Sequence, residues 1–188
     1  KSKVSAISDV HRKLLAHGAS KAMSGEKRFL RKDGTIMWAR RTMSPACDDA
    51  GNPQYLISVV EDITGRKELE HRFELTFNHA AVGMTQSSLD GHFLQVNQKF
   101  TDMLGYTREE LLGMTSEDVT HPDDRAETGQ LRQKLLSRQV ESVSSEKRLV
   151  HKDGRVIWVN RTFSVARGAS GEPLYFIAVV DDITGRKE

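Results

Sequence analysis

The chain repeats itself with a constant offset of 120 residues. Residues 26–68 recur as residues 146–188 without a gap, and 24 of the 43 aligned positions are identical. A match of this length indicates duplication of one structural unit, which constrains the architecture before any single residue is considered. The second copy extends over about residues 69–188, whereas residues 1–68 correspond only to the C-terminal half of the first. The sequence therefore predicts one complete unit preceded by half of another.

The single cysteine of the chain limits both its covalent chemistry and its compartment. Cys47 has no partner for a disulfide, and Arg167 stands at the matching position of the second copy. A unit of about 120 residues can bury a core without disulfides or metal. A chain that carries one thiol suits a reducing compartment, so we expect a cytoplasmic protein. No apolar run approaches the length that a membrane-spanning helix needs.

Charge is distributed unevenly between the two copies. Residues 1–68 hold 13 Lys and Arg against 8 Asp and Glu, and the remainder holds 15 against 18. A basic half could favour nucleic acid. Its charges are scattered and not clustered with aromatic residues, so we expect a solvated surface and no nucleic-acid partner. A salt-dependent binding assay would reveal or exclude nucleic-acid binding.

Helices are predicted from apolar spacing and from capping residues. A stripe at three-to-four spacing indicates a helix over about 64–78 that joins the two units. Asn97 and Gly105 bound a helix at 98–104, and Thr107 with Glu110 forms a capping box for a helix at 108–112. His121-Pro122-Asp123-Asp124 resembles a helix entrance, and that helix is expected to end near residue 138. A counterpart in the first copy is expected at about 6–17.

Strands are predicted on both sides of these helices. Alternation and turn residues place strands at 82–87, 92–96, 142–151, 155–166 and 174–181. Two strands, three helices and three strands in that order predict an α+β fold, an antiparallel sheet with helices on one face. The first copy repeats only the last helix and the last three strands.

Six short motifs in this order resemble the PAS domain family. They are FNHAAVGM (77–84), DGHFLQVNQKF (90–100), LGYTREELLG (104–113), HPDD (121–124), KDG followed by tryptophan (152–158) and DIT (182–184). The resemblance implies a five-stranded antiparallel sheet whose concave face, together with the helices, encloses a small cavity. It further implies a domain that senses a ligand or dimerises, and that passes its state to an output domain through terminal helices.

On this resemblance the chain divides into three parts. Residues 1–63 are the C-terminal half of a PAS-like domain, 64–80 a connecting signalling helix, and 81–188 a complete PAS-like domain. The predicted function is a sensory and signal-transmitting module whose output domain, a histidine kinase or a cyclic-dinucleotide enzyme, lies outside these residues. The alternative is a dimerisation and scaffolding module without a ligand, which large inward apolar side chains would favour.

The identity of any cofactor stays unknown at this level. PAS-like haem proteins place a histidine in the helix after HPDD, and residues 123–138 hold none, so haem is not expected. His11 and His17 of the first copy correspond to Leu131 and Ser137. The complete unit has no cysteine, which excludes covalent flavin photochemistry there but not non-covalent flavin.

No metal site or catalytic residue is predicted. His121 with Asp123 and Asp124 could be drawn as a metal or acid–base cluster, but the resemblance explains them as a capped helix start. Phosphate loops, nucleophile elbows and zinc-type cysteine spacings are absent from the sequence, so we do not expect an enzyme.

Alternation along the last strands assigns two faces to the sheet. By resemblance, one face lines the cavity and the other faces outward. The ligand-pocket candidates are Met84, Phe100, Leu104, Val159, Arg161, Phe163, Phe176 and Val180. The outward face holds Trp158, Tyr175, Ile177 and Val179, which is too apolar for water, so we expect the terminal helix or a partner's helix to cover it.

Arg161 is the one charged residue among the pocket candidates. A guanidinium on a cavity-facing strand must be paired or solvated. One interpretation is a structural salt bridge, and the other is a contact with a small anionic ligand.

The ends of the two copies carry the same candidate relay residues. Asp62 and Thr64 in the first copy, and Asp182 and Thr184 in the second, stand where the last strand meets a helix. Their hydrogen bonds could relay the state of the sheet to that helix, or could simply cap it.

The first copy is expected to need a partner. Three strands alone would leave Met37, Met43 and Leu56 on an open apolar face, which invites association. We therefore expect a homodimer, possibly swapped or completing the half domain.

Overall fold

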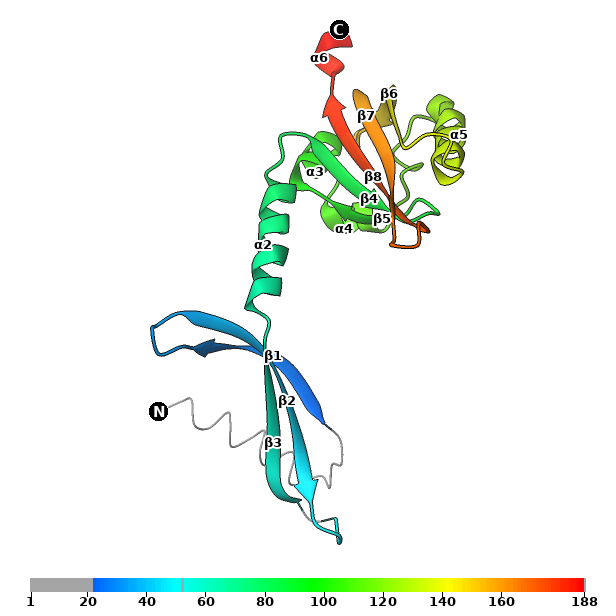
Figure 1. Cartoon of the computed structure of the whole chain (residues 1–188). Coiled ribbons are helices and arrows are strands. Elements are labelled where there is room, and N and C mark those ends of the chain that lie inside the picture. Colours follow the sequence, from blue (N-terminus) through cyan, green and yellow to red (C-terminus); the bar gives the residue numbers. More distant parts are fainter. Residues whose placement is uncertain (1–21, 52, 188) are drawn as a thin grey trace. The chain divides into compact units, whose positions relative to one another are not determined.

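The computed structural model describes residues 22–51 and 53–187 of the chain (Figure 1). They form two compact units that divide between Arg72 and Phe73. The helix predicted at about 6–17, with His11 and His17, lies outside the described residues. In the described part of the chain, no helix combines the length and the apolar character needed to cross a membrane.

The first unit is a three-stranded antiparallel sheet. Its strands are β1 (Met23–Leu30), β2 (Ile36–Cys47) and β3 (Pro53–Asp62), in the order β1-β2-β3. Ala39 is buried, whereas Met37, Met43 and Leu56 are only half-buried. Among the described residues, the strands of this unit are joined by backbone pairing and bury little apolar surface.

Helix α2 (Thr64–Asn78) follows the first sheet and coincides with the helix predicted from the apolar stripe. The boundary between the two units falls within it. On the side of the second unit, Phe73 and Phe77 stack with ring centroids 5.5 Å apart, and Phe77 is buried.

The second unit has an α+β fold built on a five-stranded antiparallel sheet. Its strands run in the order β5-β4-β8-β7-β6 (Figure 1). They are β4 (Gly83–Ser87), β5 (Phe93–Val96), β6 (Ser142–Val150), β7 (Val156–Arg167) and β8 (Pro173–Asp182). The last strand in the sequence, β8, lies at the centre, so the C-terminal exit begins in the middle of the sheet.

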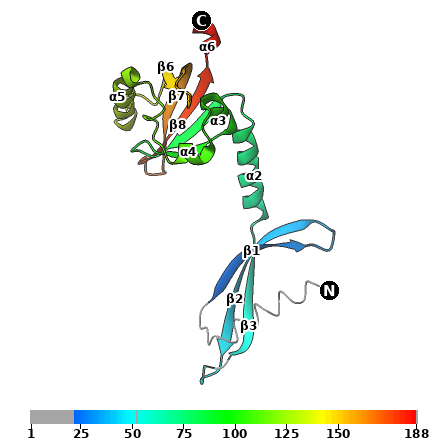
Figure 2. The same ribbon diagram turned by 180° about the vertical axis from the view of Figure 1, so that it is seen from behind.

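Helices α3 (Gln98–Leu104), α4 (Arg108–Leu112) and α5 (Arg125–Leu136) contribute to one hydrophobic core with the inner face of this sheet. Figure 2 shows α3 and α4 in front of the sheet. A short 3-10 turn, η1 (Pro122–Asp124), leads into α5, and α6 (Thr184–Lys187) ends the described chain. Helix α5 stops two residues before its predicted end. Arg138 has a φ of 60°, a left-handed conformation that an α-helix does not contain.

Asn97 is the cap of α3 and does more than the sequence predicted. Its carbonyl oxygen accepts the backbone N–H groups of Phe100 at 3.0 Å and Met84 at 2.8 Å. Its amide nitrogen donates to the carbonyl groups of Phe77 and Val82, each at 2.9 Å. One fully buried side chain thus joins the end of α2, the beginning of β4 and the first turn of α3.

Candidate functional site

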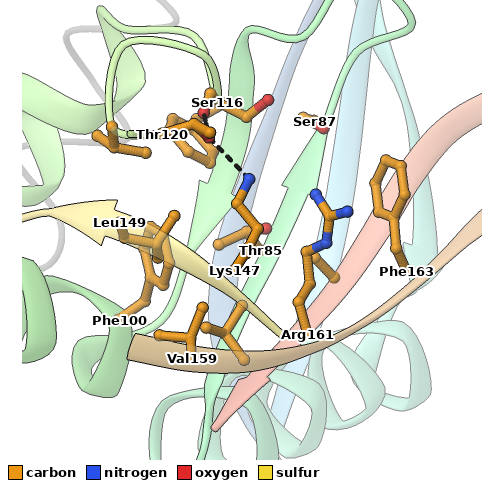
Figure 3. A pocket seen from close by; sticks show the side chains of 14 residues that line it. Thr85, Ser87, Phe100, Ser116, Thr120, Lys147, Leu149, Val159, Arg161 and Phe163 are labelled. Carbon is orange, nitrogen blue, oxygen red and sulfur yellow. Dashed lines mark hydrogen bonds between the residues drawn. The ribbon is translucent and has the colours of Figure 1, made fainter. Parts of the chain in front are cut away.

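The inner face of the five-stranded sheet lines a partly open cavity of about 40 Å³. This is room for a few water-sized groups. The walls come from β4, β5, α3, the loop before η1 and the three C-terminal strands (Figure 3). The lining residues are Thr85, Ser87, Phe93, Phe100, Ser116, Val119, Thr120, Lys147, Leu149, Val159, Arg161, Phe163, Ala178 and Val180.

The structure places the eight predicted pocket residues in three groups. Five of them line the cavity: Phe100, Val159, Arg161, Phe163 and Val180. Leu104 and Phe176 are fully buried in the surrounding core but do not line the cavity. Phe176 instead stacks on Phe163, with ring centroids 4.9 Å apart.

Met84 is a correction to the predicted inward face. It pairs with Val179 of the outward face, whereas its neighbour Thr85 pairs with Ala178 of the cavity face. Strand β4 begins at Gly83, and alternation from that residue turns Thr85 and Ser87 inward. A shift of one residue exchanges the two faces of a strand.

Lys147 lines the cavity and was missed in the sequence. It lies on β6 with only 5% of its surface exposed, between the inward-facing Ser145 and Leu149. Its ammonium group donates to the hydroxyls of Thr120 at 2.8 Å and Thr128 at 3.2 Å. Strict alternation along β6 was the available signal, because it assigns Lys147 to the face of Leu149.

Burial disfavours the charged form of Lys147. Desolvation, reinforced by the nearby positive charge of Arg161, lowers its pKa from 10.5 to about 7. Asp124 acts in the opposite direction, but its carboxylate is already engaged by Arg148 at 2.5 Å. Lys147 therefore changes its charge near neutral pH.

Arg161 is the second cation of the cavity and is 7% exposed. Its guanidinium lies over the ring of Phe163 at 4.6 Å, and its buried Nε has no hydrogen-bond partner. Within residues 22–51 and 53–187, the side chain makes no ion pair, so the structural salt bridge that the sequence allowed is not found there. Burial, and then the charge of Arg132, lowers its pKa to about 10.

Arg132 supplies a third positive charge from α5. It donates to the hydroxyl of Ser116 at 2.5 Å, lies 3.6 Å from Glu117 and stacks over Phe176 at 5.7 Å. Ser116 is itself a lining residue. The cavity is thus flanked by three cationic side chains. The charges of Arg161 and Arg132 help to lower the pKa of Lys147, and the charge of Arg132 helps to lower the pKa of Arg161.

The predicted relay residues form the same arrangement at the end of each unit. In the second unit, the N–H of Trp158 donates to Thr184 Oγ1 at 3.1 Å, and the N–H of Ile183 donates to the Trp158 carbonyl at 2.9 Å. The N–H of Thr184 donates to Asp182 at 2.9 Å. We call this set of bonds the exit clamp.

The exit clamp of the first unit matches bond for bond. Trp38 donates to Thr64 Oγ1 at 3.0 Å, Ile63 donates to the Trp38 carbonyl at 2.8 Å, and Thr64 donates to Asp62 at 2.9 Å. Asp62 also pairs with Arg31 at 2.6 Å. Hydrogen bonds from Thr64, followed by the charge of Arg31, lower the pKa of Asp62.

The outward face of the second sheet is half-buried at all four predicted positions, Trp158, Tyr175, Ile177 and Val179. Arg148 and Lys187 stack over the Trp158 ring at 5.7 and 5.3 Å. In the first unit the equivalent Tyr55, Ile57 and Val59 are exposed.

The residues weighed as a metal cluster take part in local structure. The imidazole of His121 accepts the N–H of Asp123 at 3.4 Å, and Asp124 accepts the backbone N–H of Arg148 at 2.7 Å. In the described part of the chain, no group of three His, Cys, Asp or Glu side chains is placed to hold a metal ion.

The family model of the PAS fold matches residues 3–60 and 93–180, which is most of the chain. The chain belongs to the PAS fold family. A PAS domain from Colwellia psychrerythraea has the same fold, with a TM-score of 0.58 at 21% identity, covering 63% of this chain and 99% of that one. A PAS domain of an HTR-like protein from Haloarcula marismortui gives a TM-score of 0.55 at 23% identity, covering 63% and 95%.

Sequence relatives of this PAS chain include bacterial signalling proteins. The probable diguanylate cyclase DgcE of Escherichia coli is 37% identical over 120 residues, 64% of this chain and 11% of DgcE. The sensor histidine kinase TmoS of Ectopseudomonas mendocina is 28% identical over 119 residues, 63% of this chain and 12% of TmoS. The biofilm dispersion protein BdlA of Pseudomonas aeruginosa is 23% identical over 167 residues, 87% of this chain and 40% of BdlA. The chain therefore spans between about a tenth and two fifths of the length of these relatives.

Proposed function

We propose that residues 81–188 are a sensory PAS domain whose cavity binds a small ligand and whose exit clamp transmits the bound state. Residues 64–80 serve as a signalling helix, and residues 1–63 belong to a second domain of the same kind. The relatives include a sensor histidine kinase and a probable diguanylate cyclase, which supports a relay to an output domain of one of these classes. Neither catalysis nor nucleic-acid binding is assigned to these residues, and the single cysteine suits the cytoplasm.

One observation carries this proposal: strand β7 belongs to both the cavity and the exit clamp. The backbone N–H and C=O of Trp158 are both bonded to residues of the exit. Its neighbour Val159 and, two residues further, Arg161 line the cavity. A ligand that displaces β7 must therefore strain or release the hydrogen bonds of Thr184, which begins α6.

The test is a pair of substitutions in the parent protein. Thr184→Val removes the hydroxyl that accepts from Trp158 and keeps the size of the side chain, and Thr184→Ser keeps the hydroxyl. We expect Thr184→Val to uncouple output from stimulus and Thr184→Ser to retain the coupling. Hydrogen exchange at the Ile183 amide reports whether the clamp opened. Full coupling in Thr184→Val, with that amide exposed, would show that the clamp does not transmit the signal.

A second candidate function is dimerisation and scaffolding through the outward face. The half-buried Trp158, Tyr175, Ile177 and Val179 supply an apolar surface suited to a helix or a second copy. Sedimentation of the wild type and of Ile177→Lys at micromolar concentration tests this role. We expect a homodimer that Ile177→Lys weakens, and a monomeric wild type would exclude it.

A further inference from the structure

The cavity holds positive charge without a matching negative charge. Lys147 and Arg161 stand on neighbouring strands, where Lys147 pairs with Val159 and Arg161 with Ser145, so the two cations are diagonal neighbours on one face. Both side chains rise from the sheet in the same direction, toward the cavity (Figure 3). Two buried like charges at this spacing repel each other, and an isolated buried charge is costly.

The acids around these cations are engaged or exposed. Asp124 is held by Arg148, and Glu117 lies beside Arg132. Glu127, which attracts both Lys147 and Arg161 weakly, is exposed. None of these carboxylates lines the cavity, so the described residues provide no counterion inside it.

Two hydroxyl groups on β4 complete a polar site. Thr85 and Ser87 are buried and line the same cavity as the cations. In the part of the chain that the structure describes, neither side chain makes a hydrogen bond. Each hydroxyl is therefore free to donate a hydrogen bond to a group inside the cavity.

We propose that this cavity binds a small organic carboxylate, with its head group held by Arg161 and Lys147. The inference rests on the proposed ligand-binding role and names the chemistry of the ligand. The planar fork of a guanidinium matches a carboxylate in two parallel hydrogen bonds. Phe100, Val159 and Phe163 form apolar walls that suit a short carbon chain. The cavity volume of about 40 Å³ restricts that chain to a few carbon atoms.

Calorimetric titration of the 188-residue chain at pH 6.5 tests the proposal. The probes are acetate, propionate, pyruvate, inorganic phosphate and propionamide, the uncharged counterpart of propionate. We expect one of the carboxylates to bind, and propionamide and phosphate to bind at least about 10-fold more weakly. Losing a charged hydrogen bond costs about 1.5–3 kcal/mol, so Arg161→Met should weaken binding roughly 10- to 100-fold.

Two further variants separate binding from folding. Arg161→Lys keeps the charge but not the planar guanidinium, and should bind the carboxylate with intermediate affinity. It serves as the test variant if Arg161→Met does not fold. Arg155→Met removes an exposed arginine one residue before β7 and should bind like the wild type.

Three results would overturn the proposal. They are the absence of carboxylate binding at about 10 mM together with no bound acid in native mass spectra, a preference for phosphate or propionamide, and unchanged affinity in Arg161→Met. Carboxylate binding without any change in output would instead overturn the proposed sensory role. Output that depends on Thr184 in a protein that binds no carboxylate would overturn this proposal alone.

Discussion

The two units carry the same cationic pair in very different surroundings. Lys27 and Arg41 of the first unit stand 120 positions before Lys147 and Arg161. Lys27 is exposed and lies over Phe29, and Arg41 donates to Ser58 at 2.8 Å. In the second unit both cations are buried, and Ala178 stands where the first unit has Ser58.

The difference in burial follows the helices that cover the second sheet. Strands β1 to β3 and β6 to β8 share their turns, their register shift near the end of the long strand, and their exit clamp. Only the second sheet has α3, α4 and α5 in one core with it among the described residues. Identical side chains are therefore solvated in one unit and desolvated in the other.

The largest contrast is expected in the core. Phe163→Ala should lower the free energy of unfolding of the second unit by about 3–5 kcal/mol, because Phe163 is buried. Met43→Ala, at the equivalent position, should cost about 1 kcal/mol or less, because Met43 is already half in water.

The two tryptophans allow each unit to be measured separately in urea. Trp38 reports the first unit in a Trp158→Phe background, and Trp158 reports the second in a Trp38→Phe background. Equal losses for Phe163→Ala and Met43→Ala would mean that the first unit is covered in solution.

A smaller contrast is expected for the buried lysine. Lys147→Met should stabilise the ligand-free second unit by about 1–3 kcal/mol near pH 6, because it removes a desolvated cation. Thr120 and Thr128 still donate to backbone carbonyls at 2.6 and 3.0 Å, so they stay satisfied. Lys27→Met should change the first unit by no more than about 0.5 kcal/mol. Destabilisation by Lys147→Met in urea unfolding would indicate an unrecognised counterion.

The pH dependence of stability sharpens the same comparison. The pKa of Lys147 is lowered from 10.5 to about 7 in the folded state, so between these values the unfolded chain binds more protons. The stability of the second unit should therefore rise with pH from about 7 toward 10.5. Arg161, whose pKa is lowered to about 10, keeps its charge over most of this range. Urea titrations of the wild type and Lys147→Met at several pH values measure this. An equal increase of the free energy of unfolding with pH in both proteins would show that a group other than Lys147 causes it.

The smallest contrast is expected at the exit clamps. Thr64→Val and Thr184→Val each remove one hydrogen bond to a tryptophan N–H, and each should cost about 1 kcal/mol in its own unit. Matching losses in urea unfolding would show that the clamp holds equally with and without a covered sheet. A much larger loss for Thr184→Val would show that the cavity reinforces its clamp.

Much of the fold could be predicted because local signals agree with it. Asn97 and Gly105 bound α3 as their types require, and the Thr107 capping box is present. The five-stranded antiparallel sheet and its PAS fold are confirmed. The end of α5 was missed because the turn at Arg138 has no glycine to announce it.

The site was harder to predict because it depends on which face of each strand points inward and on packing between segments that are distant in the sequence. The inward face of β4 was assigned wrongly, which put Met84 inward and hid Thr85 and Ser87. Lys147 was passed over because the two hydroxyls that accept its hydrogen bonds, on Thr120 and Thr128, are distant in the sequence. Arg161 was recognised, since a charge on an alternating apolar face is visible in the sequence itself.

The carboxamide of Asn97 has a consequence for how the domain behaves as conditions change. It joins the end of α2 to α3 through four hydrogen bonds to backbone groups. An amide carries no titratable proton, so this junction keeps its geometry across the range in which Lys147 gains or loses charge. At the beginning of the second unit, Asn97 therefore forms a junction that does not depend on pH. Inside the cavity, Lys147 carries a charge that does.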